Sequence, residues 1–100
     1  MIIIERNVQH IYPGKAAALD DLDRRYTAVE DKLGFPPKRR LSPLSGTLPL
    51  GAIVIEREWE SLAAMETAYT RYMASAEIQA LEQESQEIVE SARIELYTLL

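Results

Sequence analysis

The sequence predicts an α+β domain in which a four-stranded antiparallel sheet carries two helices on one face. Three observations lead to this prediction. Runs rich in β-branched residues, with period-two alternation, occur at the start, the middle and the end of the chain. Two amphipathic stretches separate them, and glycine and proline lie at the junctions. The resulting order is strand, helix, strand, strand, helix, strand, which is the ferredoxin-like βαββαβ order in a single domain over residues 1–100.

The first half of the chain is expected to form a strand followed by a helix. The strand runs from Ile2 to Ile11, and Tyr12-Pro13-Gly14 ends it. A helix is expected from Lys15 to Leu33 because its apolar residues are spaced by three and four. These residues are Leu19, Leu22, Tyr26, Val29 and Leu33. Gly34 follows as a C-terminal cap residue, so the helix is expected to end there.

The middle of the chain is expected to add the second and third strands. Residues 38–50 contain Pro43, Gly46 and Pro49, a content typical of an edge strand or a loop. From Leu50 to Trp59 the sequence alternates again, with Ile53, Ile55, Arg57 and Trp59 on one face. A second strong strand is therefore expected over this range.

The last forty residues are expected to form the second helical region and a closing strand. Ser61 is a plausible N-cap for the helix that follows it. A break is expected near Ala74-Ser75, because the apolar stripe changes there. The second stripe consists of Ile78, Leu81, Ser85, Ile88 and Ala92. Residues 93–100 alternate and are predicted to be the last strand.

Composition excludes several classes of function. The chain has 11 Lys and Arg against 16 Asp and Glu, a formal net charge of −5, so nucleic-acid binding is not expected. Its basic cluster is limited to Lys38, Arg39 and Arg40. The absence of cysteine excludes disulfides and thiolate chemistry. No apolar run reaches the roughly 20 residues of a membrane span. We expect no signal peptide, no membrane association and a cytoplasmic location.

The small size of the domain predicts self-association. A chain of this length buries only about 60–70% of the surface that its unfolded form exposes. Two helices cover one face of a four-stranded sheet and leave the other face bare. Ile2, Ile4 and Val8, or their neighbours of opposite parity, are expected to place apolar surface on that bare face. A homodimer formed through the sheet face is therefore expected.

Two short motifs resemble a known family. Tyr12-Pro13-Gly14-Lys15 follows the first strand, and Trp59-Glu60-Ser61-Leu62-Ala63-Ala64-Met65-Glu66 follows the third. Both resemble the NIPSNAP-like branch of the dimeric α/β-barrel superfamily, over nearly the whole chain. The resemblance implies two ferredoxin-like sheets paired face to face into a barrel, with a ligand cleft between each sheet and its helices.

The same superfamily contains antibiotic-biosynthesis and haem-degrading monooxygenases. Alignment with their cleft places Asn7 at their strand asparagine, Tyr72 at their tryptophan and Glu82 at their histidine. A carboxylate is not the neutral imidazole that such a haem site uses, so no haem and no other cofactor is expected. Two functions stay open. One is a non-catalytic NIPSNAP-like protein that binds a small metabolite, and the other is a cofactor-free monooxygenase or cyclase for an aromatic or polyketide-type substrate.

An aromatic stripe near the second helical region supplies the candidate ligand-binding residues. It consists of Trp59, Met65, Tyr69, Tyr72 and Met73. Such a stripe can line a flat apolar pocket in which the Tyr69 and Tyr72 hydroxyls, together with Asn7, orient an aromatic molecule. The same spacing is also typical of an ordinary core, and the sequence leaves both interpretations open.

His10 is the one histidine and the one candidate catalytic residue. An imidazole can accept a proton near neutral pH, which would suit a general base. The alternative is a strand-end histidine that bonds to a neighbour or to water. No second histidine or cysteine accompanies it, so no metal site is expected.

Charged residues on strands and helices receive structural interpretations. Arg6 and Arg57 are expected to pair with glutamates in an ion-pair network inside the dimer, because a buried guanidinium needs an acidic partner. The available partners are Glu5, Glu56, Glu58 and Glu95. The acidic stretches 20–23 and 82–90 are expected to be solvated helix faces.

Overall fold

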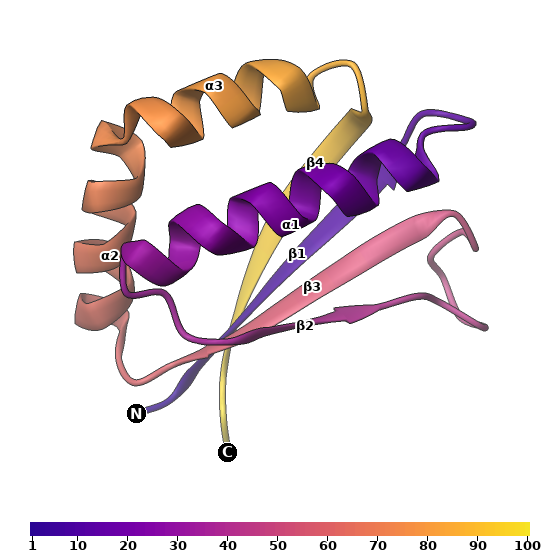
Figure 1. The fold of residues 1–100 in the computed structure, drawn as a ribbon. Coiled ribbons are helices and arrows are strands. Elements are labelled where there is room, and N and C mark those ends of the chain that lie inside the picture. The colour runs from indigo at the N-terminus through magenta and orange to yellow at the C-terminus, as the bar shows by residue number, and fades with distance from the viewer.

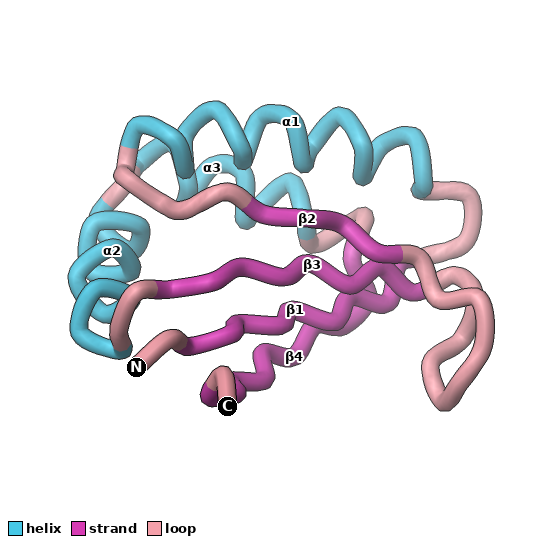
Figure 2. Tube along the Cα trace, turned by 90° about the horizontal axis from the view of Figure 1, so that it is seen from below, coloured by secondary structure: helices cyan, strands magenta, loops and turns pink.

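The computed structural model describes residues 1–100 and contains four strands and three helices. They are β1 (Ile3–Ile11), α1 (Ala16–Lys32), β2 (Lys38–Leu41), β3 (Ala52–Trp59), α2 (Leu62–Ala74), α3 (Ala76–Ser85) and β4 (Val89–Thr98). All three helices lie on one side of a single sheet (Figures 1 and 2). The predicted α+β class and the ferredoxin-like order are confirmed, with the second helical region divided into α2 and α3.

The sheet has the order β2-β3-β1-β4, and every pair of neighbours is antiparallel. Asn7 of β1 lies opposite Ile55 of β3 and Ile94 of β4. Asn7 lines a cavity together with Leu22 of α1, so it faces the helices. Because side chains alternate along a strand, the other odd-numbered residues of β1 also face the helices, and the even-numbered ones face away from them. The helix-facing side of β1 is thus Ile3, Glu5, Asn7, Gln9 and Ile11.

Capping residues set the helix boundaries. Gly34 has φ +81°, the left-handed conformation in which a Cβ is disfavoured, and it ends α1 as predicted. The Ser61 hydroxyl accepts a hydrogen bond from the Ala64 amide at 3.1 Å, which confirms it as the N-cap of α2. The Ser75 hydroxyl accepts one from the Ile78 amide at 3.2 Å. Ser75 is extended, so it both ends α2 and starts α3, and the expected break is confirmed.

Two expected boundaries were wrong. The stripe of residues 78–92 was expected to be helical throughout, but α3 ends at Ser85 and Val89 already belongs to β4. Ile88 is buried in the same core as Ile78 because the turn after α3 brings it there, so the apolar spacing continued without a helix. The strand expected from Leu50 starts at Ala52, whose amide donates to the Pro49 carbonyl at 3.0 Å in a turn.

The core consists of two clusters between the sheet and the helices. The first joins α1, α3 and the following turn through Leu19, Leu22, Val29, Ile78, Leu81 and Ile88. The second, at the α2 end, consists of Ile3, Phe35, Trp59 and Ala68, with Tyr69 and Tyr72 packed against it. Figure 2 shows α2 at one end of the helical layer, where this second cluster lies. Leu22 of the first cluster and Tyr72, which packs against the second, both line one cavity.

The face of the sheet that no helix covers is mixed in character. Glu56 on this face pairs with Arg6 and with Arg39, each at 2.7 Å. Val8 is buried there, but Arg6 is beside it on the same strand face and stacks over the ring of Tyr97, 5.1 Å from the centroid. Ile4 and Val8 thus lie on this face as expected, but charged side chains lie between them. No helix of the chain has the length and apolar character needed to cross a membrane.

Candidate functional site

A cavity of about 390 Å³ lies between the helix-facing side of the sheet and the helices. Its volume is at the lower end of the range typical of small-molecule sites. Apolar walls come from α1, β3 and β4, chiefly Leu19, Leu22, Ile55 and Val89. The polar residues that line it include Asn7, Gln9, Tyr26, Tyr69, Tyr72 and Glu82. The cavity therefore combines apolar surface with a concentrated set of polar groups.

Two side-chain amides of β1 have oxygens with no hydrogen-bond partner. Asn7 Oδ1 and Gln9 Oε1 are both buried, and neither accepts a hydrogen bond from the protein. Both residues line the cavity. Leaving a buried acceptor unpaired costs about 1–3 kcal/mol, so such groups are rare in folded proteins and cluster where a ligand or water completes them. The unpaired oxygens thus belong to two residues that line the cavity.

Three phenols line the cavity, from two helices. Tyr26 comes from α1, and Tyr69 and Tyr72 come from α2. Burial raises the pKa of each of the three above its ordinary value of 10.0. At Tyr69 the neighbouring Glu5 carboxylate raises the pKa further. All three tyrosines are consequently neutral at physiological pH and can donate or accept hydrogen bonds.

The aromatic stripe is both core and cavity wall. Phe35 packs edge to face against Trp59 and against Tyr69, with ring centroids 5.1 Å apart in each pair. Tyr72 packs against the same cluster and also lines the cavity. The two interpretations that the sequence left open therefore both apply to Tyr69 and Tyr72. Met73 is different, because its side chain is 70% exposed and lies outside this face.

A buried carboxylate anchors the aromatic end of the cavity. Glu5 Oε1 accepts a hydrogen bond from Trp59 Nε1 at 2.9 Å, and its Oε2 accepts one from the Tyr69 hydroxyl. Glu5 lines the cavity and is 4% exposed. Both of its partners are neutral donors. The carboxylate is therefore hydrogen-bonded, but no cation forms an ion pair with it.

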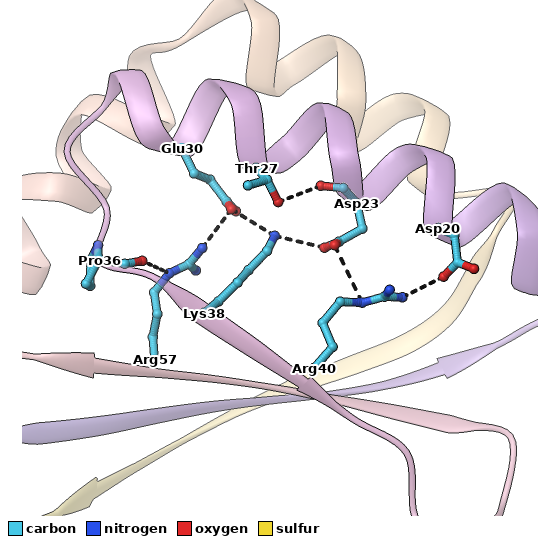
Figure 3. Close-up of polar contacts among 8 residues, drawn as sticks. All are labelled: Asp20, Asp23, Thr27, Glu30, Pro36, Lys38, Arg40 and Arg57. Atoms are coloured by element: carbon cyan, nitrogen blue, oxygen red, sulfur yellow. Dashed lines mark hydrogen bonds and ion pairs between the residues drawn. The ribbon is translucent and has the colours of Figure 1, made fainter.

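A second charged cluster forms the wall between α1 and the β2–β3 edge. Glu30 Oε1 accepts from Lys38 Nζ at 2.9 Å and from Arg57 Nη2 at 2.7 Å. Lys38 Nζ also contacts Asp23 Oδ1 at 2.8 Å, and Arg57 Nε donates to the Pro36 carbonyl at 3.0 Å (Figure 3). The cations and carboxylates of this cluster balance, and their fixed geometry holds β2 against α1.

The structure corrects the expected role of Asp23 and of Arg57. Asp23 is largely buried, because it pairs with Lys38. The other acidic residues of the two stretches are exposed as expected, and one of them, Glu82, also lines the cavity. Arg57 does not share a network with Arg6. The two arginines lie on opposite faces of the sheet, since Glu5 pairs with Arg57 and Arg6 pairs with Glu56 in the register. Arg6 keeps an expected partner, Glu56, whereas Arg57 takes Glu30 from the helix above it.

The expected site residues are distributed as follows. Asn7, Tyr69 and Tyr72 line the cavity together. Trp59 is 3% exposed and does not line it, but its indole N–H holds Glu5, which does. His10 has the opposite parity from Asn7 and lies beside a separate surface depression formed with Tyr12. The geometry therefore places three of the five expected residues on the cavity, Trp59 behind Glu5, and His10 away from it.

Gln9, Tyr26 and Glu82 are cavity residues that the ligand-site prediction did not include. Gln9 could have been predicted from the sequence, because it follows Asn7 by two residues on the same strand and so shares its face. The spacing of Tyr26 within the apolar stripe of α1 predicts a core position, so the sequence gives no sign that it lines a cavity. No group of three or more His, Asp or Glu side chains is arranged to hold a metal ion.

No protein-family model matches the chain, and no curated protein matches it in sequence. Solved structures do match. A NIPSNAP family protein from Agrobacterium tumefaciens has a TM-score of 0.83 and 19% identity, covering 99% of this chain and 86% of that one. A NIPSNAP-like domain protein from Burkholderia xenovorans gives 0.83 and 15%, covering 99% and 85%. SnoaB, a cofactor-independent oxygenase from Streptomyces nogalater, gives 0.70 and 14%, covering 98% and 92%.

These likenesses define the fold of the chain. It is the ferredoxin-like α+β fold of the NIPSNAP proteins, over nearly the full length of both chains. The resemblance expected from residues 12–15 and 59–66 is confirmed at the level of the fold. A cofactor-independent oxygenase shares that fold, so the fold does not select between binding and catalysis.

Proposed function

We propose that this chain is a NIPSNAP-like protein that binds a small metabolite in the cavity between its sheet and its helices. The observation that carries the proposal is the pair of buried, unpartnered oxygens, Asn7 Oδ1 and Gln9 Oε1, on two residues that line that cavity. A protein retains such groups against their cost in stability when a ligand completes them. Tyr72 adds a neutral phenol to the lining of the cavity, and Tyr69 and Trp59 contribute through their hydrogen bonds to Glu5.

Thermal unfolding in the presence of a library of small aromatic and aliphatic molecules tests the proposal. A molecule that binds only the folded state at 100 times its Kd stabilises it by about 2.7 kcal/mol, which raises Tm by several degrees. Asn7→Leu should abolish the rise for the molecules that produce it. Gln83→Leu, an exposed amide on α3 outside the cavity, is the matched control and should leave the rise intact. A rise that survives in Asn7→Leu contradicts the proposed site.

A cofactor-free monooxygenase or cyclase acting on an aromatic or polyketide-type substrate is the second candidate. Two observations favour it: the fold is shared with SnoaB, and Asn7 lies in one cavity with three phenols that can orient a hydroxylated ring. His10 is not part of this candidate site, because the sheet separates it from the cavity. Oxygen uptake with hydroxylated polycyclic substrates tests it, and uptake must disappear in Asn7→Leu. No uptake with any such substrate favours binding alone.

We further propose that a second copy of the chain covers the open face of the sheet. Support comes from the one-sided placement of the helices (Figure 2) and from exposed Tyr97 and half-buried Ile4 on that face. Light scattering should give twice the 11.3 kDa mass of one chain, and Ile4→Glu should halve it. A wild-type protein that is monomeric at micromolar concentration contradicts this proposal.

A cytoplasmic location completes the proposal and is supported by the cysteine-free sequence, because cysteine pairs are typical of exported small domains. Fractionation of cells that express the natural gene tests the location. Recovery of the protein from the medium or from an exported fraction contradicts it.

A further inference from the structure

We propose that the ligand carries a primary ammonium group on an aromatic or apolar body. This inference rests on the proposed binding function and names the chemical class of molecule that the cavity accepts. It follows from three features of the cavity: the kind of hydrogen-bonding group left unpaired, the balance of charge on the walls, and the apolar surface that continues from the cavity along β4.

The unpaired groups are acceptors on cavity-lining residues, so a ligand that completes them must donate. Asn7 Oδ1 and Gln9 Oε1 belong to residues two apart on one face of β1, whose Cα atoms are therefore about 7 Å apart. Side chains that leave the strand in the same direction can converge on one group between them. An ammonium group has three N–H donors and no acceptor, and it can satisfy both oxygens at once. A carboxylate or phosphate offers neither oxygen a partner.

The charge on the cavity walls favours a cation. Four carboxylates line the cavity, Glu5, Asp23, Glu30 and Glu82, against two cations, Lys38 and Arg57. Both cations form ion pairs with Asp23 or Glu30. Glu5 is held by neutral donors only, and Glu82 makes no salt bridge. Two negative charges thus remain without a cationic partner, which attracts a positively charged ligand and repels an anion.

The remaining surface fits an apolar body. Tyr26 and Tyr72 present aromatic rings beside aliphatic side chains of α1 and β3, and a ring face also attracts an ammonium group. On β4, Ala92 lines the cavity, and Ile94 and Leu96 continue on the same face of the strand with exposed fractions of 55% and 47%. An apolar path therefore leads out of the cavity toward the free edge of the sheet.

Four probes of similar size test the inference, each titrated at neutral pH while the side-chain amide resonances of Asn7 and Gln9 are followed by NMR. They are phenethylamine, phenethyltrimethylammonium, phenethyl alcohol and phenylacetate. Phenethylamine should bind about tenfold more tightly than the alcohol, because its hydrogen bonds are charge-assisted. It should also bind more tightly than the trimethylammonium probe, which lacks N–H donors, and phenylacetate should not bind.

Two charge-neutralising variants separate the wall charge from simple packing. Glu82→Gln should weaken phenethylamine binding about three- to tenfold and leave the alcohol unchanged, since only the cation interacts with that carboxylate. Glu66→Gln, which removes the same charge from an exposed α2 position outside the cavity, is the matched control and should change neither.

The outcomes distinguish this inference from the proposed function. Binding of the alcohol as tight as that of the amine, with shifts at Asn7 and Gln9, overturns the ammonium class and leaves the cavity a binding site. Tighter binding of phenylacetate overturns the charge argument. If none of the four probes shifts either amide resonance at millimolar concentration, the inference fails, and a library screen without hits then shows that the proposed function has failed as well.

Discussion

The side chains of Glu5 and Trp59 are joined by a hydrogen bond of 2.9 Å, although the two residues are 54 positions apart in the chain. The antiparallel pairing of β1 with β3 brings them onto the same face of the sheet. Tyr69 of α2 donates to the other carboxylate oxygen, so one buried glutamate connects both central strands to a helix. The aromatic end of the cavity has its shape because of this carboxylate.

Replacing Glu5 should destabilise the fold. In Glu5→Leu the Trp59 indole N–H and the Tyr69 hydroxyl lose their buried acceptor, which should lower the free energy of unfolding by about 2–4 kcal/mol. Urea denaturation measures this. Glu66→Leu is the control, because Glu66 is exposed on α2 and forms no ion pair, and it should change stability by less than about 0.5 kcal/mol. Equal effects of the two substitutions would show that Glu5 has no special role.

Glu30 is expected to matter through the cations that it neutralises. In Glu30→Gln the buried Arg57 guanidinium loses its carboxylate partner and Lys38 keeps only Asp23, so unfolding free energy should fall by about 3 kcal/mol. Denaturation curves of this variant should be compared with those of Asp31→Asn, an exposed neighbour without a salt bridge. A loss below about 1 kcal/mol in Glu30→Gln would mean that the ion-pair cluster contributes little.

The raised pKa values of the buried tyrosines predict instability at alkaline pH. Burial, and then the Glu5 carboxylate, raise the pKa of Tyr69 above its ordinary 10.0, and burial does the same for Tyr72. Above that pH the unfolded chain loses phenolic protons that the folded chain keeps. The folded state then binds more protons, so the free energy of unfolding must fall as pH rises.

Urea unfolding at about pH 8 and about pH 11 measures this fall, and phenolate absorbance follows ionisation directly. Tyr69→Phe should reduce the fall because it removes one of the responsible phenols. Ionisation of every tyrosine of the folded protein near pH 10.0, with no change in stability, would refute the assignment.

Asn7 is predicted to serve binding at the expense of stability. Asn7→Leu removes a buried amide oxygen that has no partner, so the ligand-free variant should be as stable as the wild-type protein or about 1 kcal/mol more stable. Chemical denaturation without added ligand tests this. A loss of more than about 2 kcal/mol would show that Asn7 has an unrecognised structural partner.

The elements of the fold were largely predictable because their signals are local. Gly34, Ser61 and the break at Ser75 act through backbone conformation and caps within a few residues, and each was found at its expected place. The end of α3 at Ser85 could not be predicted from the apolar spacing, because Ile88 is still buried after the helix has ended. The mixed character of the open sheet face depends on strand register, which single-strand alternation does not determine.

The site was predictable only in part because it depends on contacts between distant segments. Asn7, Tyr69 and Tyr72 were identified from the family resemblance and the aromatic stripe. The imidazole of His10 also suited a catalytic role. Because side chains alternate along β1, His10 lies on the sheet face opposite to that of Asn7, and the sequence does not say which face the helices cover. The pairing of Arg57 with Glu30 joins a strand to a helix 27 residues away, which spacing rules within one element do not reveal.

A crystal structure of the complex with the best molecule from the binding screens tests the central claim most directly. The account predicts ligand density in the cavity, with a donor atom of the ligand within about 3 Å of both Asn7 Oδ1 and Gln9 Oε1. Density for the ligand on another surface, or a cavity filled by repacked side chains with both oxygens bonded to the protein itself, would contradict it.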